Sequence, residues 1–170
     1  MKSVYFAGPL VFHPSYDNFV VTIKELCPSF SIHPRIPGDG SISSPTAKRI
    51  FAENMSHLYQ CDLILADITP FRGACVDDGT AFEIGVAAAL KKDIYTYSNR
   101  SGTYADTVKE IVGCSSSPLR DAQDALIEDF SLPANLMISQ AATNHTVVSQ
   151  GDLYTNFPRA LSEILQRFFS

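Results

Sequence analysis

Four acidic side chains gather between residues 67 and 83. Asp67 follows the apolar run 62–66, Asp77 and Asp78 come next, and Glu83 lies in an alanine-rich segment. Exposed N–H groups and the helix dipole favour a carboxylate in a first helical turn, so Glu83 is expected to keep a low pKa. Asp67 sits at the end of a buried strand, where desolvation is expected to raise its pKa. Such a pair cleaves glycosidic bonds with retention, one carboxyl attacking the anomeric carbon and the other protonating the leaving group. The alternative is a structural role without catalysis, in which Asp67 caps the end of its strand and Glu83 interacts with the helix dipole.

The surrounding pattern predicts the elements that hold these side chains. Apolar runs bounded by Gly and Pro indicate strands, and apolar residues at helical spacing indicate helices. Strands are predicted at 3–7, 31–33, 62–66, 94–97 and 135–139, and helices at 16–27, 45–60, 80–91 and 153–168, with helical turns at 104–112 and 122–129. Ser44 and Pro45 form a favourable helix start.

The alternation of strands and helices predicts an α/β fold. We expect a doubly wound, mostly parallel five-stranded sheet with helices on both faces, Rossmann-like or flavodoxin-like, in one domain over 1–170. Ligands of such sheets bind at the carboxyl ends of the strands. The loops after Ala7, Ala66 and Tyr97 are therefore the predicted site.

Composition excludes several classes of function. The 170 residues carry 13 Lys and Arg against 18 Asp and Glu, a net charge of −5, which argues against wrapping of nucleic acid. No run is long enough to span a membrane, and the N-terminus lacks the apolar core of a signal peptide. The four cysteines form no CxxC pair, so we expect no metal site and mostly buried thiols in a reducing cytoplasm. No glycine-rich dinucleotide or phosphate fingerprint is present, and no cofactor is expected.

Four segments together resemble one known family. They are Val4-Tyr-Phe-Ala-Gly-Pro9, Asp67-Ile-Thr-Pro-Phe-Arg-Gly73, Asp77-Asp-Gly-Thr-Ala-Phe-Glu83-Ile-Gly-Val-Ala87 and Asn135-Leu-Met137. In this order they resemble the signature of the nucleoside 2-deoxyribosyltransferases. The resemblance implies transfer of a 2-deoxyribosyl group between nucleobases through a covalent enzyme ester. The implied partners are deoxynucleosides and free nucleobases.

The resemblance also implies roles for individual residues. Glu83 would be the nucleophile, Tyr5 would hold its carboxylate, and Asp67 would contact and protonate the leaving base. Asp77 would bind sugar hydroxyls or support the site. Asn135 and Met137 would complete the site of a neighbouring subunit, so the protein would be a homo-oligomer.

The remaining candidates are expected to contact substrate. Planar bases stack on aromatic rings, although core packing is the common role of any one Phe. Arg72 would either brace its loop or reach the substrate. The candidates for substrate binding are Phe6, Gly8, Phe12, Phe71, Arg72 and Gly79, together with Asn135 and Met137.

Two other functions fit the same residues. A hydrolase on this scaffold would release the base to water, from deoxynucleosides or their 5′-monophosphates. The loop 8–12 has one Gly, no Arg and no Ser, which favours unphosphorylated nucleosides. A non-catalytic nucleotide-binding domain is the third possibility, and it would not require Glu83 or Tyr5.

Overall fold

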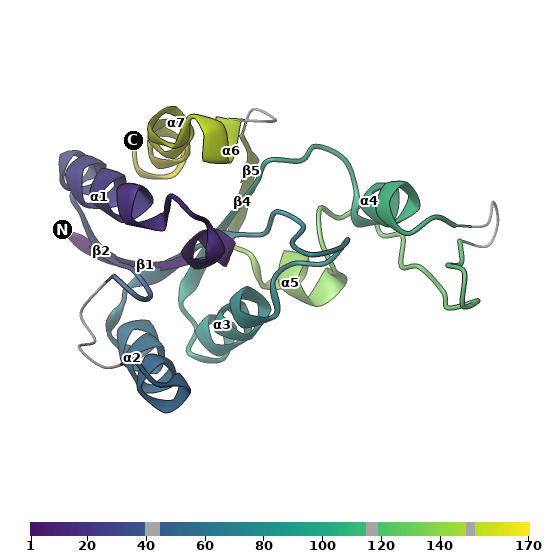
Figure 1. Cartoon of the computed structure of the whole chain (residues 1–170), viewed down its shortest axis with the longest axis horizontal. Coiled ribbons are helices and arrows are strands. Elements are labelled where there is room, and N and C mark those ends of the chain that lie inside the picture. Colours follow the sequence, from purple (N-terminus) through teal and green to yellow (C-terminus); the bar gives the residue numbers. More distant parts are fainter. Residues whose placement is uncertain (40–44, 115–118, 149–151) are drawn as a thin grey trace.

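The computed structural model describes residues 1–39, 45–114, 119–148 and 152–170, and its centre is a five-stranded parallel sheet (Figure 1). The strands run in the order β2-β1-β3-β4-β5, and every pairing is parallel. Their bounds are β1 (Lys2–Ala7), β2 (Ile32–Arg35), β3 (Leu63–Asp67), β4 (Asp93–Ser98) and β5 (Asn144–Val147). The predicted doubly wound fold is confirmed, in the flavodoxin-like order.

Helices cover both faces of the sheet (Figure 1). One face carries α1 (Tyr16–Leu26) and α7 (Phe157–Phe169), and the other carries α2 (Ala47–Gln60), α3 (Asp78–Ala89) and α5 (Leu136–Ala141). The helix α4 (Tyr104–Ile111) stands away from the sheet (Figure 1). The shorter helices are η1 (Pro9–Phe12), η2 (Cys27–Phe30) and α6 (Asp152–Thr155).

Strand β1 supplies side chains to two separate cores. Val4 and Phe6 pack in the core beneath α1 and α7, whereas Tyr5 and Ala7 pack in the core beneath α2 and α3. This alternation follows from the two-residue period of a strand. Strand β3 is buried along its whole length, as expected for a central strand covered on both faces.

Two predicted elements in the second half of the chain are wrong. Residues 135–139 do not form a strand, because Asn135 accepts a hydrogen bond from Met137 N–H and so caps helix α5. The fifth strand is β5 instead. Residues 122–129 do not form a helix, because Arg120 pairs with Leu126 in an antiparallel bridge and Asp124 turns the chain at a φ of 64°.

The boundaries of α2, of α3 and of the C-terminal helix differ from the predictions by more than one residue. Thr46 caps α2 by accepting the Arg49 N–H, whereas Ser44 lies outside the described residues. Helix α3 begins at Asp78, so Glu83 lies in its second turn. The C-terminal helix is split into α6 and α7 at Asn156, which precedes a proline at the start of α7.

Candidate active site

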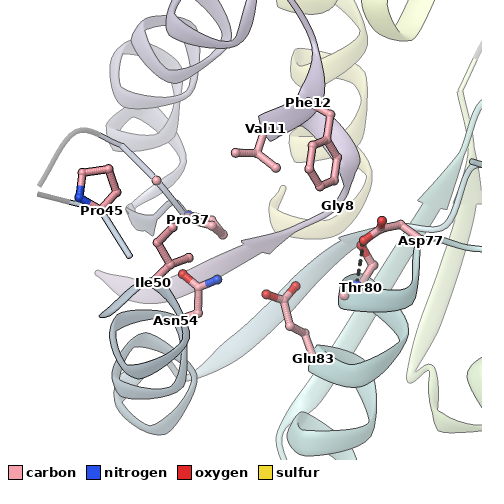
Figure 2. Close-up of a pocket in the computed structure, with 12 residues that line it drawn as sticks. Gly8, Val11, Phe12, Pro37, Pro45, Ile50, Asn54, Asp77, Thr80 and Glu83 are labelled. Carbon is pink, nitrogen blue, oxygen red and sulfur yellow. Dashed lines mark hydrogen bonds between the residues drawn. The ribbon is translucent and has the colours of Figure 1, made fainter. Parts of the chain in front are cut away.

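A cavity of about 430 Å³ opens beyond the carboxyl ends of β1 and β3 (Figure 2). Its walls come from the loop after β1, the loop before α2, helix α2 and the start of α3. The lining residues are Gly8, Val11, Phe12, Pro37, Gly38, Pro45, Ile50, Asn54, Asp77, Gly79, Thr80 and Glu83. The cavity therefore lies where the strand order reverses, which is the usual ligand site of such sheets.

Glu83 points into this cavity from α3 (Figure 2). The Tyr5 hydroxyl donates a hydrogen bond of 2.5 Å to Glu83 Oε1. Burial raises the pKa of Glu83 to about 7, the Tyr5 hydrogen bond lowers it, and the charge of Asp77 raises it. The predicted low pKa is wrong, because Glu83 lies one turn further into the helix and desolvation outweighs its hydrogen bond. The structure brings Tyr5 and Glu83 together as predicted.

Asp77 holds the start of α3 and also lines the cavity. Its Oδ2 accepts hydrogen bonds from the backbone N–H of Thr80 (3.0 Å) and from the Thr80 hydroxyl (3.1 Å). A Cβ atom at Gly79 would lie 3.2 Å from this oxygen, so glycine leaves the carboxylate room. Asp77 thus caps α3 and forms part of the cavity wall at the same time.

Asp67 lies behind the cavity. Its side chain is fully buried, and both oxygens accept hydrogen bonds: Oδ1 from Thr69 N–H (2.9 Å) and Oδ2 from the Tyr154 hydroxyl (2.8 Å). Burial raises its pKa to about 6, the expected direction, while these hydrogen bonds lower it. A Cβ atom at Gly8 would lie 2.8 Å from Asp67 Cβ. Asp67 thus does not line the cavity, whereas Gly8, which packs closely against it, does.

The candidate aromatic residues divide between the cavity and the core. Phe12 lines the cavity, and Phe71 stacks on it with 5.5 Å between ring centroids. The Arg72 guanidinium lies over both rings, 5.1 Å from the Phe12 centroid and 4.7 Å from that of Phe71. Phe6 is buried in the core beneath α1 and α7, because strand alternation turns it away from Tyr5. Its predicted contact with substrate is not supported.

Asn135 and Met137 lie on α5, outside the cavity lining. Asn135 caps the helix and donates a hydrogen bond from Nδ2 to Glu128 (3.1 Å). The side chain of Met137 is 72% exposed. Within one copy of the chain, neither residue joins Glu83.

Sequence reasoning missed Asn54, which lines the cavity from α2 opposite Glu83 (Figure 2). Among the described residues, its buried Oδ1 has no hydrogen-bond partner. A buried polar atom without a partner is unfavourable unless a ligand or water satisfies it. The available signal was helical spacing, since Asn54 lies one turn after Ile50, another lining residue.

The described part of the chain offers no cluster of three or more metal-ligating side chains. Within the same ranges, no helix is long and apolar enough to cross a bilayer. Cys27 and Cys61 are buried, whereas Cys75 and Cys114 are exposed, so burial of the thiols is less complete than predicted.

Comparison with known proteins identifies the family. The model of the nucleoside 2-deoxyribosyltransferases matches residues 4–137, which include Tyr5, Asp77 and Glu83. The chain belongs to this nucleoside 2-deoxyribosyltransferase family. A 2-deoxyribosyltransferase from Leishmania mexicana is 30% identical, with 99% of both chains covered and a TM-score of 0.70. The resemblance inferred from the sequence motifs is confirmed.

Two further proteins extend the comparison. An uncharacterized Schizosaccharomyces pombe protein, C191.05c, is 29% identical over 114 residues, which is 62% of this chain. The match spans only 54%, about half, of that relative's length. A CMP N-glycosidase from Clostridium botulinum has a TM-score of 0.56 at 12% identity, with 98% of this chain and all of that chain covered. That likeness concerns the fold alone.

Proposed function

We propose that the protein transfers a 2-deoxyribosyl group between nucleobases, with Glu83 as the nucleophile. The observation that carries this proposal is the Glu83 carboxyl on the cavity wall, held by the Tyr5 hydroxyl. Family membership and the likeness to the Leishmania mexicana 2-deoxyribosyltransferase support the same reaction.

The chemistry proceeds in two displacements. The free oxygen of ionised Glu83 attacks C1′ of the deoxynucleoside, the C–N bond breaks, and its electron pair leaves with the base, which takes up a proton from an acid at the site or from water. The resulting ester is then attacked at C1′ by a ring nitrogen of a second base, which loses its N–H proton to the same group or to water, and the carboxylate is regenerated. A 2-deoxysugar lacks the electron-withdrawing 2-hydroxyl group, so its oxocarbenium-like transition state is reached more easily.

The cavity supplies groups for both parts of the substrate. Asn54 carries an unsatisfied amide oxygen for a donor on the base or sugar, and Asp77 offers its carboxylate to sugar hydroxyls. The ring of Phe12 provides a face for a planar base. Direct protonation of the base by Asp67 stays a prediction, since the Asp67 carboxyl is bound to Tyr154 and does not line the cavity.

A second copy of the chain is part of the proposal. Asn135 and Met137 would reach the cavity of a neighbouring subunit in a homo-oligomer. An exposed aromatic pair on α2 and α3, Phe51 and Phe82, supports such an association, since the two side chains are 57% and 52% exposed. We further propose that the enzyme acts in the cytoplasm, in nucleoside salvage.

A base-exchange assay tests the proposed function. The protein is incubated with 2′-deoxyinosine, with and without adenine, and products are separated by chromatography, with thymidine as a second donor. We expect 2′-deoxyadenosine to form with the wild-type protein and to be lost with Glu83→Gln. Free hypoxanthine without exchanged nucleoside would instead identify a hydrolase. Absence of turnover with every nucleoside and deoxynucleoside monophosphate would overturn the enzymatic proposal.

A further inference from the structure

Tyr154 lies outside the part of the chain that matches the family model, yet it contacts a residue inside it. Its hydroxyl reaches across from α6 to donate a hydrogen bond of 2.8 Å to Asp67 Oδ2. Its neighbour Leu153 is fully buried in the core beneath α1 and α7. Core packing therefore sets the position from which Tyr154 approaches the site.

The ring of Tyr154 contacts the loop that follows β1. It stacks on the His13 ring at 5.6 Å between centroids, with an interplanar angle of 19°. His13 is itself fixed to this loop, because its backbone N–H donates to Leu10 O (2.9 Å). Val11 and Phe12 lie between Leu10 and His13 in sequence, and both line the cavity. The tyrosine ring therefore supports one end of a cavity wall.

The hydroxyl of Tyr154 supports the other end of the same loop through Asp67. The Gly8 backbone lies so close to Asp67 that an added Cβ would meet Asp67 Cβ at 2.8 Å. Gly8 has a φ of 151°, a conformation that other residues rarely adopt. Because Tyr154 and Thr69 N–H hold the two oxygens of Asp67, they fix the side chain against which Gly8 packs.

We propose that Tyr154 is a positioning residue for substrate binding, which fixes the wall 8–12 of the cavity through His13 at one end and Asp67 at the other. The kinetic part of this inference rests on the proposed function. Tyr154 acts without touching the reacting atoms, so its loss should weaken substrate binding and leave the displacement at Glu83 in place.

The titration of Asp67 provides a spectroscopic signature. Among the described residues, the neutral side chains of Tyr154 from α6, Tyr97 from β4 and Thr69 from the following loop interact with its carboxyl. Burial raises the pKa of both tyrosines well above the ordinary value, so both phenols stay protonated. The hydrogen bond from Tyr154 lowers the pKa of Asp67, which lies at about 6. Removal of the hydroxyl is therefore expected to raise it.

The kinetic test compares Tyr154→Phe with Tyr95→Phe. The ring of Tyr95 packs on Phe168 from β4, and its hydroxyl has no hydrogen bond to a described residue. For Tyr154→Phe we expect KM for 2′-deoxyinosine to rise about tenfold with kcat within about twofold, the effect of losing one hydrogen bond to a charged group. Tyr95→Phe should change neither constant. A fall in kcat at constant KM, or equal constants in the two variants, would overturn the proposal.

A second readout does not depend on turnover. In NMR spectra of the full chain, Tyr154→Phe should move the amide signals of Gly8 and Phe12 and shift the carboxyl titration of Asp67 to higher pH. His13→Leu removes the ring stack and should move the signal of Gly8, five residues away, through Tyr154 and Asp67, which keeps the test available if Tyr154→Phe fails to fold. Unchanged signals in both variants would overturn the proposal. Lack of turnover by the wild-type protein would overturn only the proposed function.

Discussion

The two buried carboxyl groups near the ends of β1 and β3 have similar pKa values but different surroundings. Burial raises the pKa of Glu83 to about 7 and that of Asp67 to about 6. Among the described residues, Glu83 accepts one hydrogen bond, from Tyr5, and it lines the cavity. Asp67 accepts hydrogen bonds at both oxygens and is fully buried.

This difference supports the proposed division of roles, with Glu83 as the nucleophile and Asp67 held by the protein. A nucleophile needs an oxygen that is open to the substrate, and Glu83 Oε2 on the cavity wall has no hydrogen-bond partner among the described residues. Both oxygens of Asp67 accept hydrogen bonds from the protein, and these bonds fix the orientation of its carboxyl. A perturbed pKa alone therefore does not identify the reacting group. The hydrogen-bond partners of each carboxyl and its position relative to the cavity are also needed to distinguish the two candidates.

The largest expected effect is the difference in lost activity between substitutions of Glu83 and of Asp67. Glu83→Gln removes the proposed nucleophile, so kcat for base exchange should fall by about 10³-fold or more. Asp67→Asn should lower it far less, because that carboxyl does not line the cavity. Steady-state chromatographic assays of both variants measure the contrast. Equal losses would show that Asp67 takes part in the chemistry directly.

The same substitution should stabilise the fold. The ordinary pKa of 4.5 for Glu83 rises to about 7 on folding, so ionisation opposes folding increasingly as the pH rises from 4.5 to 7. At pH 8, Glu83→Gln should therefore raise the free energy of unfolding by about 2 kcal/mol, and the gain should shrink as the pH falls towards 4.5. Urea unfolding at several pH values measures it. The exposed Glu25 gives the control Glu25→Gln, and an equal gain there would contradict the prediction.

The hydroxyl of Tyr5 should set the pH dependence of the reaction. The proposed mechanism requires ionised Glu83, so kcat/KM should rise with pH through about 7. Tyr5→Phe removes a hydrogen bond that lowers the pKa of Glu83, and the rise should then move to higher pH. A shift of one unit reduces the ionised fraction near neutral pH by up to about tenfold. The pH–rate profile tests this, and a profile unchanged from wild type would show that Tyr5 does not control the carboxyl.

The smallest expected effect concerns Asn54. If its buried amide oxygen accepts a hydrogen bond from substrate, Asn54→Ala should raise KM by about fivefold and change kcat little. Gln60→Ala, at the exposed end of α2, is the matched control. Identical KM values for Asn54→Ala and the wild-type enzyme would remove Asn54 from the substrate site and leave the cavity's polar contacts to Asp77 and Thr80.

The sheet was predictable where its strands are buried on both faces. β1, β3 and β4 each present a short apolar run that ends in a loop, and this local pattern is sufficient. β5 was not predictable, because Asn144–Val147 is a partly polar edge strand. The apolar run 135–139 was mistaken for it, since short apolar runs do not distinguish a strand from a helix.

The contact between Tyr5 and Glu83 was predictable, because family motifs mark both residues. The pKa of Glu83 was not, because desolvation depends on the tertiary packing around α3. Asn54 and Tyr154 lie outside any recognised motif. Tyr154 meets Asp67 across 87 positions of sequence, a contact that only the folded chain creates.

The alternation along β1 makes the hydrogen bond between Tyr5 and Glu83 depend on the pairing of the sheet. Tyr5 lies opposite Arg35 of β2 on one side and Ile64 of β3 on the other. A deletion or insertion of one residue within this strand would exchange the directions of Tyr5 and Phe6. The hydroxyl would then enter an apolar core and a benzene ring would replace it beside Glu83. Changes of length in β1 should therefore be far less tolerable to this enzyme than substitutions, even where the sheet still assembles.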